Sequence, residues 1–155
     1  MPKKNVDILV IALSSPILVG IYEDGLLVDE VISEEKSSDV LPMIFKDLFQ
    51  KYNIKNLYYT NGPGSFMAIK VAYIFLKSIT VLKDIPFFAT DAFNFNKNNP
   101  IKAIGKLCFV KIGSEIKTQK MDSYEVVEFK LPNILKKDEF STDTTPLYKI
   151  DAVGK

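Results

Sequence analysis

Residues 58–70 read YYTNGPGSFMAIK, a strand-like run that breaks at Gly-Pro-Gly-Ser and leads directly into an apolar segment. A phosphate-binding loop needs successive backbone amides that point inward, with a helix N-terminus behind them. Gly62 and Gly64 fit that outline, but Pro63 has no amide hydrogen and no Gly-Lys-Ser/Thr motif follows. The alternative is a structural corner, in which glycine supplies positive φ and Ser65 caps the helix. The sequence favours the corner.

The segments on either side of this turn alternate between strand-like and helix-like patterns. Asp24-Gly25 is typical of a two-residue hairpin turn between antiparallel strands. Three-to-four-residue apolar spacing after the helix-capping candidates Ser37, Ser38 and Asp39 predicts an amphipathic helix that ends near Asn53. The order βββ-α-β-α-β predicts an α/β domain with a mixed sheet. The expected strands are 7–13, 17–22, 26–32, 57–60 and 86–90, and the second helix is expected at 65–83.

The second half of the chain is more polar and less regular. The Asn-rich stretch 94–100 indicates a loop or a hinge. Alternating patterns then predict strands at 102–111, 115–121 and 124–131, whereas 132–145 has no clear period. We therefore expect an N-terminal subdomain at 1–95 and a reduced C-terminal subdomain at 96–155 whose tail returns to the first.

Composition excludes several classes of protein. The 155 residues are 47% hydrophobic and 25% charged, which is typical of one packed globular domain rather than a disordered chain. A net charge of +1, from 20 basic and 19 acidic residues, provides no basic surface for direct binding of a nucleic-acid backbone. A single cysteine, Cys108, forbids an internal disulfide. Without a signal peptide or a membrane-spanning apolar segment, we expect a cytoplasmic protein that does not bind membranes.

The absence of histidine narrows the possible chemistry further. No Ser-His or Cys-His pair and no histidine metal ligand can form. One cysteine without histidine also excludes the usual zinc sites. Ser14, Ser15, Ser65 and Cys108 are therefore interpreted as cap, turn or core residues. We expect no catalytic residue, no metal and no cofactor.

Three segments together resemble a known family. The run NGPGSFMAIKVAYIFLKSI (61–79) resembles the GPGSFTGLRIG segment of the TsaB (YeaZ) family. DVLPMIFKDLF (39–49) is similar to the first helix of that family, and the ending TPLYKIDAVGK resembles its Pro-x-Tyr-x-Arg tail. TsaB is the non-catalytic partner in the bacterial machinery that makes threonylcarbamoyladenosine (t6A) on tRNA. The turn residues of the family motif are Gly62, Pro63, Gly64, Ser65 and Phe66.

The resemblance implies an ASKHA fold, the actin/Hsp70-like and ribonuclease H-like architecture. It also implies a heterodimer with the catalytic subunit TsaD, a complex with the ATPase TsaE, and contact with tRNA only through that complex. The free chain could be a monomer or a homodimer, and the sequence leaves both open. The sequence departs from the family where Leu13-Ser14-Ser15-Pro16 replaces Asp-Thr-Ser-Thr, which argues against independent ATP binding. Met67, Ala68 and Lys70 also replace the Thr, Gly and Arg of the family. An ASKHA-fold ATPase and a glycoprotease-like peptidase remain alternatives.

The second expected helix is apolar around most of its circumference. A helix on a sheet needs an apolar stripe of roughly 100°, and only Lys70, Lys77, Ser78 and Thr80 interrupt the segment from Phe66 to Leu82. Either the rest of this chain or another chain must cover the excess. We predict that both helices form a partner-binding surface. Its residues are Leu41, Ile44, Phe45 and Leu48 on the first helix and Ala68, Ala72, Phe75 and Ile79 on the second.

Overall fold

A five-stranded mixed sheet forms the centre of the protein in a computed structural model that describes residues 2–147. Its strand order is β3-β2-β1-β4-β5, with β1 antiparallel to β2 and parallel to β4. The element order βββαβα predicted from the sequence is confirmed. The strands are β1 (Lys4–Ile11), β2 (Ile17–Glu23), β3 (Leu26–Ser33), β4 (Tyr52–Thr60) and β5 (Phe87–Thr90).

The turn between β2 and β3 is the tight hairpin that the sequence predicts. Asp24 and Gly25 both have positive φ, at 52° and 82°. Two successive residues in the left-handed region are what a type I′ turn requires, and this turn matches the natural twist of the paired strands. The hairpin therefore places β3 at the outer edge of the sheet.

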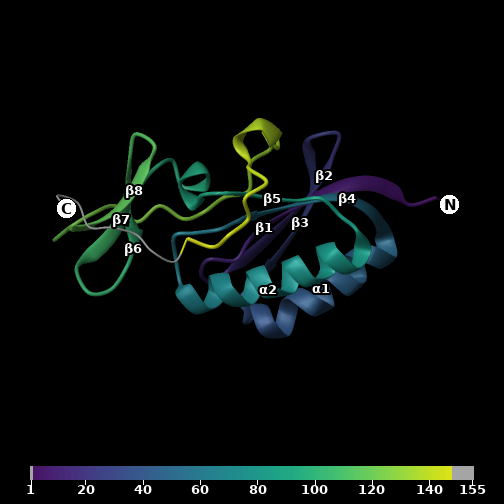
Figure 1. Cartoon of the computed structure of the whole chain (residues 1–155), viewed down its shortest axis with the longest axis horizontal. Helices are drawn as coiled ribbons and strands as arrows, with labels where there is room; N and C mark the ends of the chain where they lie inside the picture. Colours follow the sequence, from purple (N-terminus) through teal and green to yellow (C-terminus); the bar gives the residue numbers. More distant parts are fainter. Residues whose placement is uncertain (1, 148–155) are drawn as a thin grey trace.

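Two helices, α1 (Ser37–Lys51) and α2 (Phe66–Lys83), lie together on one face of this sheet (Figure 1). The predicted capping of α1 is wrong, because Ser37 is already the first helical residue and Lys36 is the N-cap without a side-chain hydrogen bond. The Lys36 carbonyl instead accepts hydrogen bonds from the amides of Asp39 and Val40. Pro42 lies inside the helix rather than in its first turn. None of the described helices is long and apolar enough to cross a membrane.

The sheet has a hydrophobic core on each face, because successive apolar side chains of its buried strands point to opposite faces. Val6, Ile8 and Val10 of β1 pack on the face that carries the helices. Leu9 and Ile11 belong to the core on the opposite face. Neither α1 nor α2 covers that second face, although the short 3-10 helix η1 (Ala92–Phe95) lies against it. Phe93 and Leu135, which lie far apart in the sequence, pack there.

A second, three-stranded antiparallel sheet follows, in the order β6-β7-β8. The expected strand at 102–111 is interrupted by a turn at Gly105, whose φ is 61°. The expected strand at 124–131 is wrong, because this segment pairs with no strand of the described structure. It runs between the two sheets, and the amide of Lys130 donates a hydrogen bond to the carbonyl of Phe95. The strands are β6 (Ile101–Lys102), β7 (Leu107–Ile112) and β8 (Glu115–Lys120).

The irregular segment 133–147 returns to the first sheet. Backbone hydrogen bonds of 2.9 and 2.7 Å join Ala89 and Ser141 in both directions. The ammonium group of Lys137 lies 2.9 Å from the carboxylate of the buried Asp7, and the hydroxyl of Tyr59 donates to the carbonyl of Thr144. This part of the chain therefore packs with residues 1–95. The boundary at 95/96 stays a prediction, and the family-like tail from Tyr148 onward lies outside the described residues.

Candidate functional site

The Gly-Pro-Gly-Ser turn packs tightly at the end of β4. Gly62 has a φ of 124°, and an added Cβ would lie 3.2 Å from the Cβ of Leu147. At Gly64, an added Cβ would lie 3.0 Å from the side chain of Leu13. Close approach and backbone conformation thus account for both glycines without a ligand.

The polar groups of this turn also serve structural contacts. The carbonyl of Gly62 accepts a hydrogen bond from the amide of Ala92, and the amide of Ser65 donates to the carbonyl of Leu13. The Ser65 hydroxyl accepts from the amide of Ala68 and caps α2, as the corner interpretation requires. Phe66 begins the helix with its side chain about half exposed. These contacts support a structural corner at the turn.

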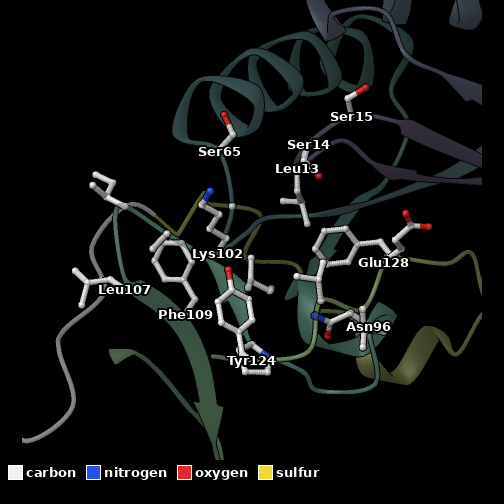
Figure 2. A pocket seen from close by; sticks show the side chains of 18 of the residues that line it. Leu13, Ser14, Ser15, Ser65, Asn96, Lys102, Leu107, Phe109, Tyr124 and Glu128 are labelled. Carbon is white, nitrogen blue, oxygen red and sulfur yellow. The ribbon is translucent and has the colours of Figure 1, made fainter. Parts of the chain in front are cut away.

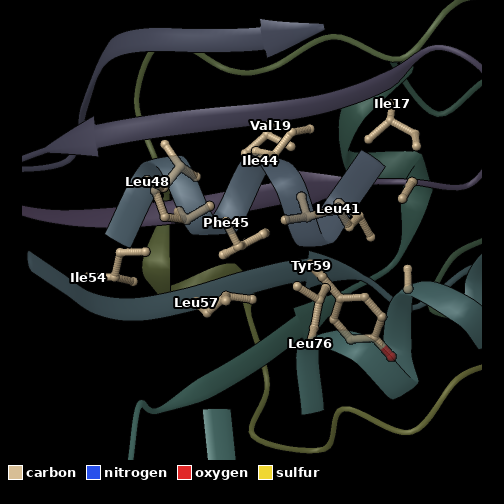
Figure 3. Packing of buried hydrophobic residues seen from close by; sticks show 14 of the residues in the cluster. Ile17, Val19, Leu41, Ile44, Phe45, Leu48, Ile54, Leu57, Tyr59 and Leu76 are labelled. Carbon is tan, nitrogen blue, oxygen red and sulfur yellow. The ribbon is translucent and has the colours of Figure 1, made fainter. Parts of the chain in front are cut away.

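The four α1 residues predicted to bind a partner lie inside the protein. Figure 3 shows their side chains on the sheet-facing side of α1, over β1, β2 and β4. Each is at most 9% exposed, so none is available to another chain in this structure. The prediction for these four residues is therefore wrong, because they pack in the core between the sheet and α2. The residues are Leu41, Ile44, Phe45 and Leu48.

The rest of the chain covers the predicted edge of α2 only in part. Ala72 is 1% exposed. Phe75 packs edge-on against Phe45 of α1, with ring centroids 5.7 Å apart, and Ile79 packs against the same core. Ala68 is half-buried near the start of the helix. Ala72 thus belongs to the core, which corrects its assignment to a partner surface. Ala68, Phe75 and Ile79 are half-buried, and their assignment stays a prediction.

The exposed apolar residues of α2 lie elsewhere on the helix. Met67, Ile74 and Val81 follow one another at seven-residue intervals and are 61%, 54% and 68% exposed. Half-buried Val71 and exposed Ser78 lie between them, so that these five positions are separated in turn by four, three, four and three residues. We refer to Met67, Ile74 and Val81 as the outer stripe. Sequence reasoning missed it, although the seven-residue spacing was the available signal.

A cavity of about 860 Å³ lies between the two sheets (Figure 2). Leu13 to Pro16 and the first residues of α2 border it on one side, and β6 to β8 border it on the other. The segment 124–129 forms a further wall. Most of the lining side chains are apolar. A smaller cavity of about 510 Å³ separates the N-terminal ends of α1 and α2.

The polar residues around the larger cavity do not form a recognisable catalytic group. Ser15 donates a hydrogen bond of 2.8 Å to the carboxylate of Glu34, and Cys108 is buried. A hydrogen bond with Cys108 raises the pKa of the Tyr124 hydroxyl above its ordinary value. Within residues 2–147, no three Cys, Asp or Glu residues cluster as metal ligands would. The partly buried ion pair between Lys111 and Asp91, at 2.7 Å, joins the second sheet to the end of β5.

Comparison with known proteins finds similarity in structure but no match in sequence. No protein-family model matches the sequence, and no curated protein matches it. YeaZ from Pseudomonas aeruginosa is similar in structure, with a TM-score of 0.52 and 14% sequence identity over 79% of this chain and 67% of that chain. A second structure, described as an uncharacterized protein with similarity to peptidase YEAZ from Pseudomonas aeruginosa, has a TM-score of 0.52 and 13% identity over 74% of this chain and 63% of that chain. The chain has an α/β fold with a βββαβα mixed sheet that resembles the ASKHA domain of YeaZ.

Proposed function

We propose that this chain is a non-catalytic scaffold subunit required for N6-threonylcarbamoyladenosine modification of tRNA, and that it binds TsaD and supports its activity. The YeaZ-like fold carries the proposal. The turn motif Gly62 to Phe66, on which the family resemblance rests, lies between β4 and α2 of that fold. The proposal extends to TsaE in the same cytoplasmic complex and to tRNA contact through the other subunits.

The outer stripe is the surface that we assign to the partner. Apolar side chains at seven-residue spacing, with further positions at intervals of four and three, follow the seam along which two helices pack. Lys70 and Lys77 lie beside the stripe and are exposed. Such a surface favours a partner helix with an apolar face and acidic flanking residues.

The outer stripe alone is too small to form a stable interface, so further residues must contribute buried area. A specific protein–protein interface buries roughly 1,600 Å² in total, and a few central residues carry most of its energy. Met43 of α1 is 68% exposed and Leu82 of α2 is 82% exposed. These two residues and the outer stripe provide apolar surface on both helices, with Ile74 near the middle of α2. The same surface would bring two copies together when TsaD is absent.

Modified nucleosides in tRNA test this function. In the organism that encodes the chain, depletion of the protein should lower t6A in total tRNA, as measured by liquid chromatography and mass spectrometry. Wild-type protein should restore it, and Ile74→Glu should not. Ile112→Glu is a matched control, because Ile112 is 56% exposed and Ile74 is 54% exposed. Unchanged t6A after depletion would contradict the proposed function.

A further inference from the structure

The cavity between the two sheets has the dimensions of a small-molecule site. Its volume of about 860 Å³ lies within the roughly 300–1,000 Å³ of most ligand pockets. Leu18 lines it from the first sheet and Leu13 from the loop that follows β1. Phe109 lines it from the second sheet and Phe129 from the connecting segment. Binding of an apolar ligand between these walls would be favourable, because it would remove the apolar surface of the ligand from water.

One side of this cavity is positively charged. Lys102 lines it, and its ammonium group forms no ion pair or hydrogen bond with any described residue. In Figure 2 this ammonium group is directed toward Ser65, at the N-terminus of α2. A helix N-terminus carries partial positive charge, and the 18-residue α2 begins here at the cavity. The ammonium group and the helix end would therefore both stabilise an anion on this side.

A buried amide on the cavity wall has an unused acceptor. Asn96 lines the cavity and is 2% exposed. Its Nδ2 donates a hydrogen bond of 2.9 Å to the carbonyl of Asn99, but its Oδ1 has no partner within the described structure. A buried acceptor without a donor is unfavourable, and the great majority of buried side-chain polar atoms have a partner. This oxygen is itself buried, however, so it is not part of the surface that a ligand in the cavity would contact.

The single carboxylate among the lining residues lies away from Lys102. Glu128 is exposed, and Figure 2 shows it on the side of Leu13 and Ser15. We propose that the cavity binds an amphipathic organic anion, whose apolar body fills the space between the sheets and whose anionic group lies between Lys102 and the N-terminus of α2.

Two fluorescent probes of similar shape and different charge test this site. The purified full chain is titrated with the anion 8-anilino-1-naphthalenesulfonate and with uncharged N-phenyl-1-naphthylamine. We expect both to bind at one site. Lys102→Met should weaken binding of the anion about tenfold, as loss of a charge-assisted contact does, and should leave the uncharged probe within about twofold. Equal effects on the two probes would overturn the anion assignment.

Further variants locate the probes. Thr118 lines the cavity from β8, so Thr118→Trp should weaken both probes at least about tenfold by filling the apolar space, since tryptophan is favoured in strands. Lys106→Met, in the turn between β6 and β7, should change neither, because Lys106 is exposed beside Asp122 and does not line the cavity. Ile74→Glu, in the outer stripe, should also leave both affinities unchanged. Absence of binding, or binding that survives in a folded Thr118→Trp variant, would overturn the proposal.

Discussion

The two helices that lie side by side on the sheet use their apolar residues in different ways. The buried face of α1 contains Val40, Leu41, Ile44, Phe45 and Leu48. Its exposed positions are mostly polar, apart from Pro42 and Met43. On α2, the buried residues are Ile69, Ala72, Leu76 and Thr80, while the outer stripe remains exposed. Almost all apolar side chains of α1 are thus buried in the core, whereas several apolar side chains of α2 remain exposed.

This difference indicates which helix is suited to a partner. A surface helix of a soluble domain normally presents polar side chains to water. The outer stripe does not follow that pattern, and exposed apolar patches on helices commonly mark interaction sites. We therefore assign α1 to stabilising the fold, and α2 both to stabilising it and to binding the partner. Substitutions on the two faces of each helix separate these roles.

The largest effect is expected at the inner face of α2. Ala72→Glu would place a carboxylate in a position that is 1% exposed and has no room for a longer side chain. Burial of an unpaired charge and overpacking should together remove most of the roughly 5–15 kcal/mol that stabilises a domain. Circular dichroism should show loss of the folded state or a very large fall in Tm. A folded variant with a Tm close to wild type would show that Ala72 faces a partner surface after all.

A smaller but still large effect is expected at the inner face of α1. Phe45→Ala removes a ring that is 1% exposed and that packs against Phe49 and Phe75. The loss should be about 3–5 kcal/mol, because a cavity remains where the ring was. Denaturant unfolding measures it directly, with Met43→Ala on the exposed face of α1 as the control. A loss below about 1 kcal/mol would contradict the assignment of Phe45 to the core.

A gain in stability is expected from the exposed side of α1. Pro42 lies inside the helix, where it removes one backbone hydrogen bond and disfavours the regular helix. Pro42→Ala should therefore raise the free energy of unfolding, by up to roughly 3 kcal/mol. Because Pro42 is exposed, no core contact is lost. A Tm that falls in this variant would show that α1 depends on the proline for its geometry.

The sequence was sufficient for features that depend on local chemistry. Asp24-Gly25 predicted the hairpin turn, and Ser65 predicted the start of α2. Both rest on interactions within a few residues, which a sequence pattern records directly. The mixed sheet followed from the order of these elements. The burial of Gly62 and Pro63 in a packed corner also agrees with what the turn chemistry favoured.

Features that depend on distant segments were harder to predict. Residues 133–147 have no periodic pattern, yet they bond to β3 and β5 through backbone groups, which any sequence can provide. Residues 124–131 alternate like a strand, but they pair with no strand of the described structure, and the amide of Lys130 bonds to the carbonyl of Phe95. On α2, apolar residues around most of the helix could not show which face the sheet would cover. The cavity likewise arises from segments that are separated by about 100 residues or more in the sequence, such as Leu13 and Phe129.

The most direct test of the outer stripe compares Ile74→Glu with Ile112→Glu in complex formation with TsaD from the same organism. Both substitutions place the same charge at an isoleucine that is a little more than half exposed, so each should change the stability of the free chain by no more than about 1 kcal/mol. Size-exclusion chromatography with light scattering should show a heterodimer with the wild type and with Ile112→Glu, and free subunits with Ile74→Glu. A heterodimer that persists with folded Ile74→Glu would contradict the assignment of the partner surface to α2.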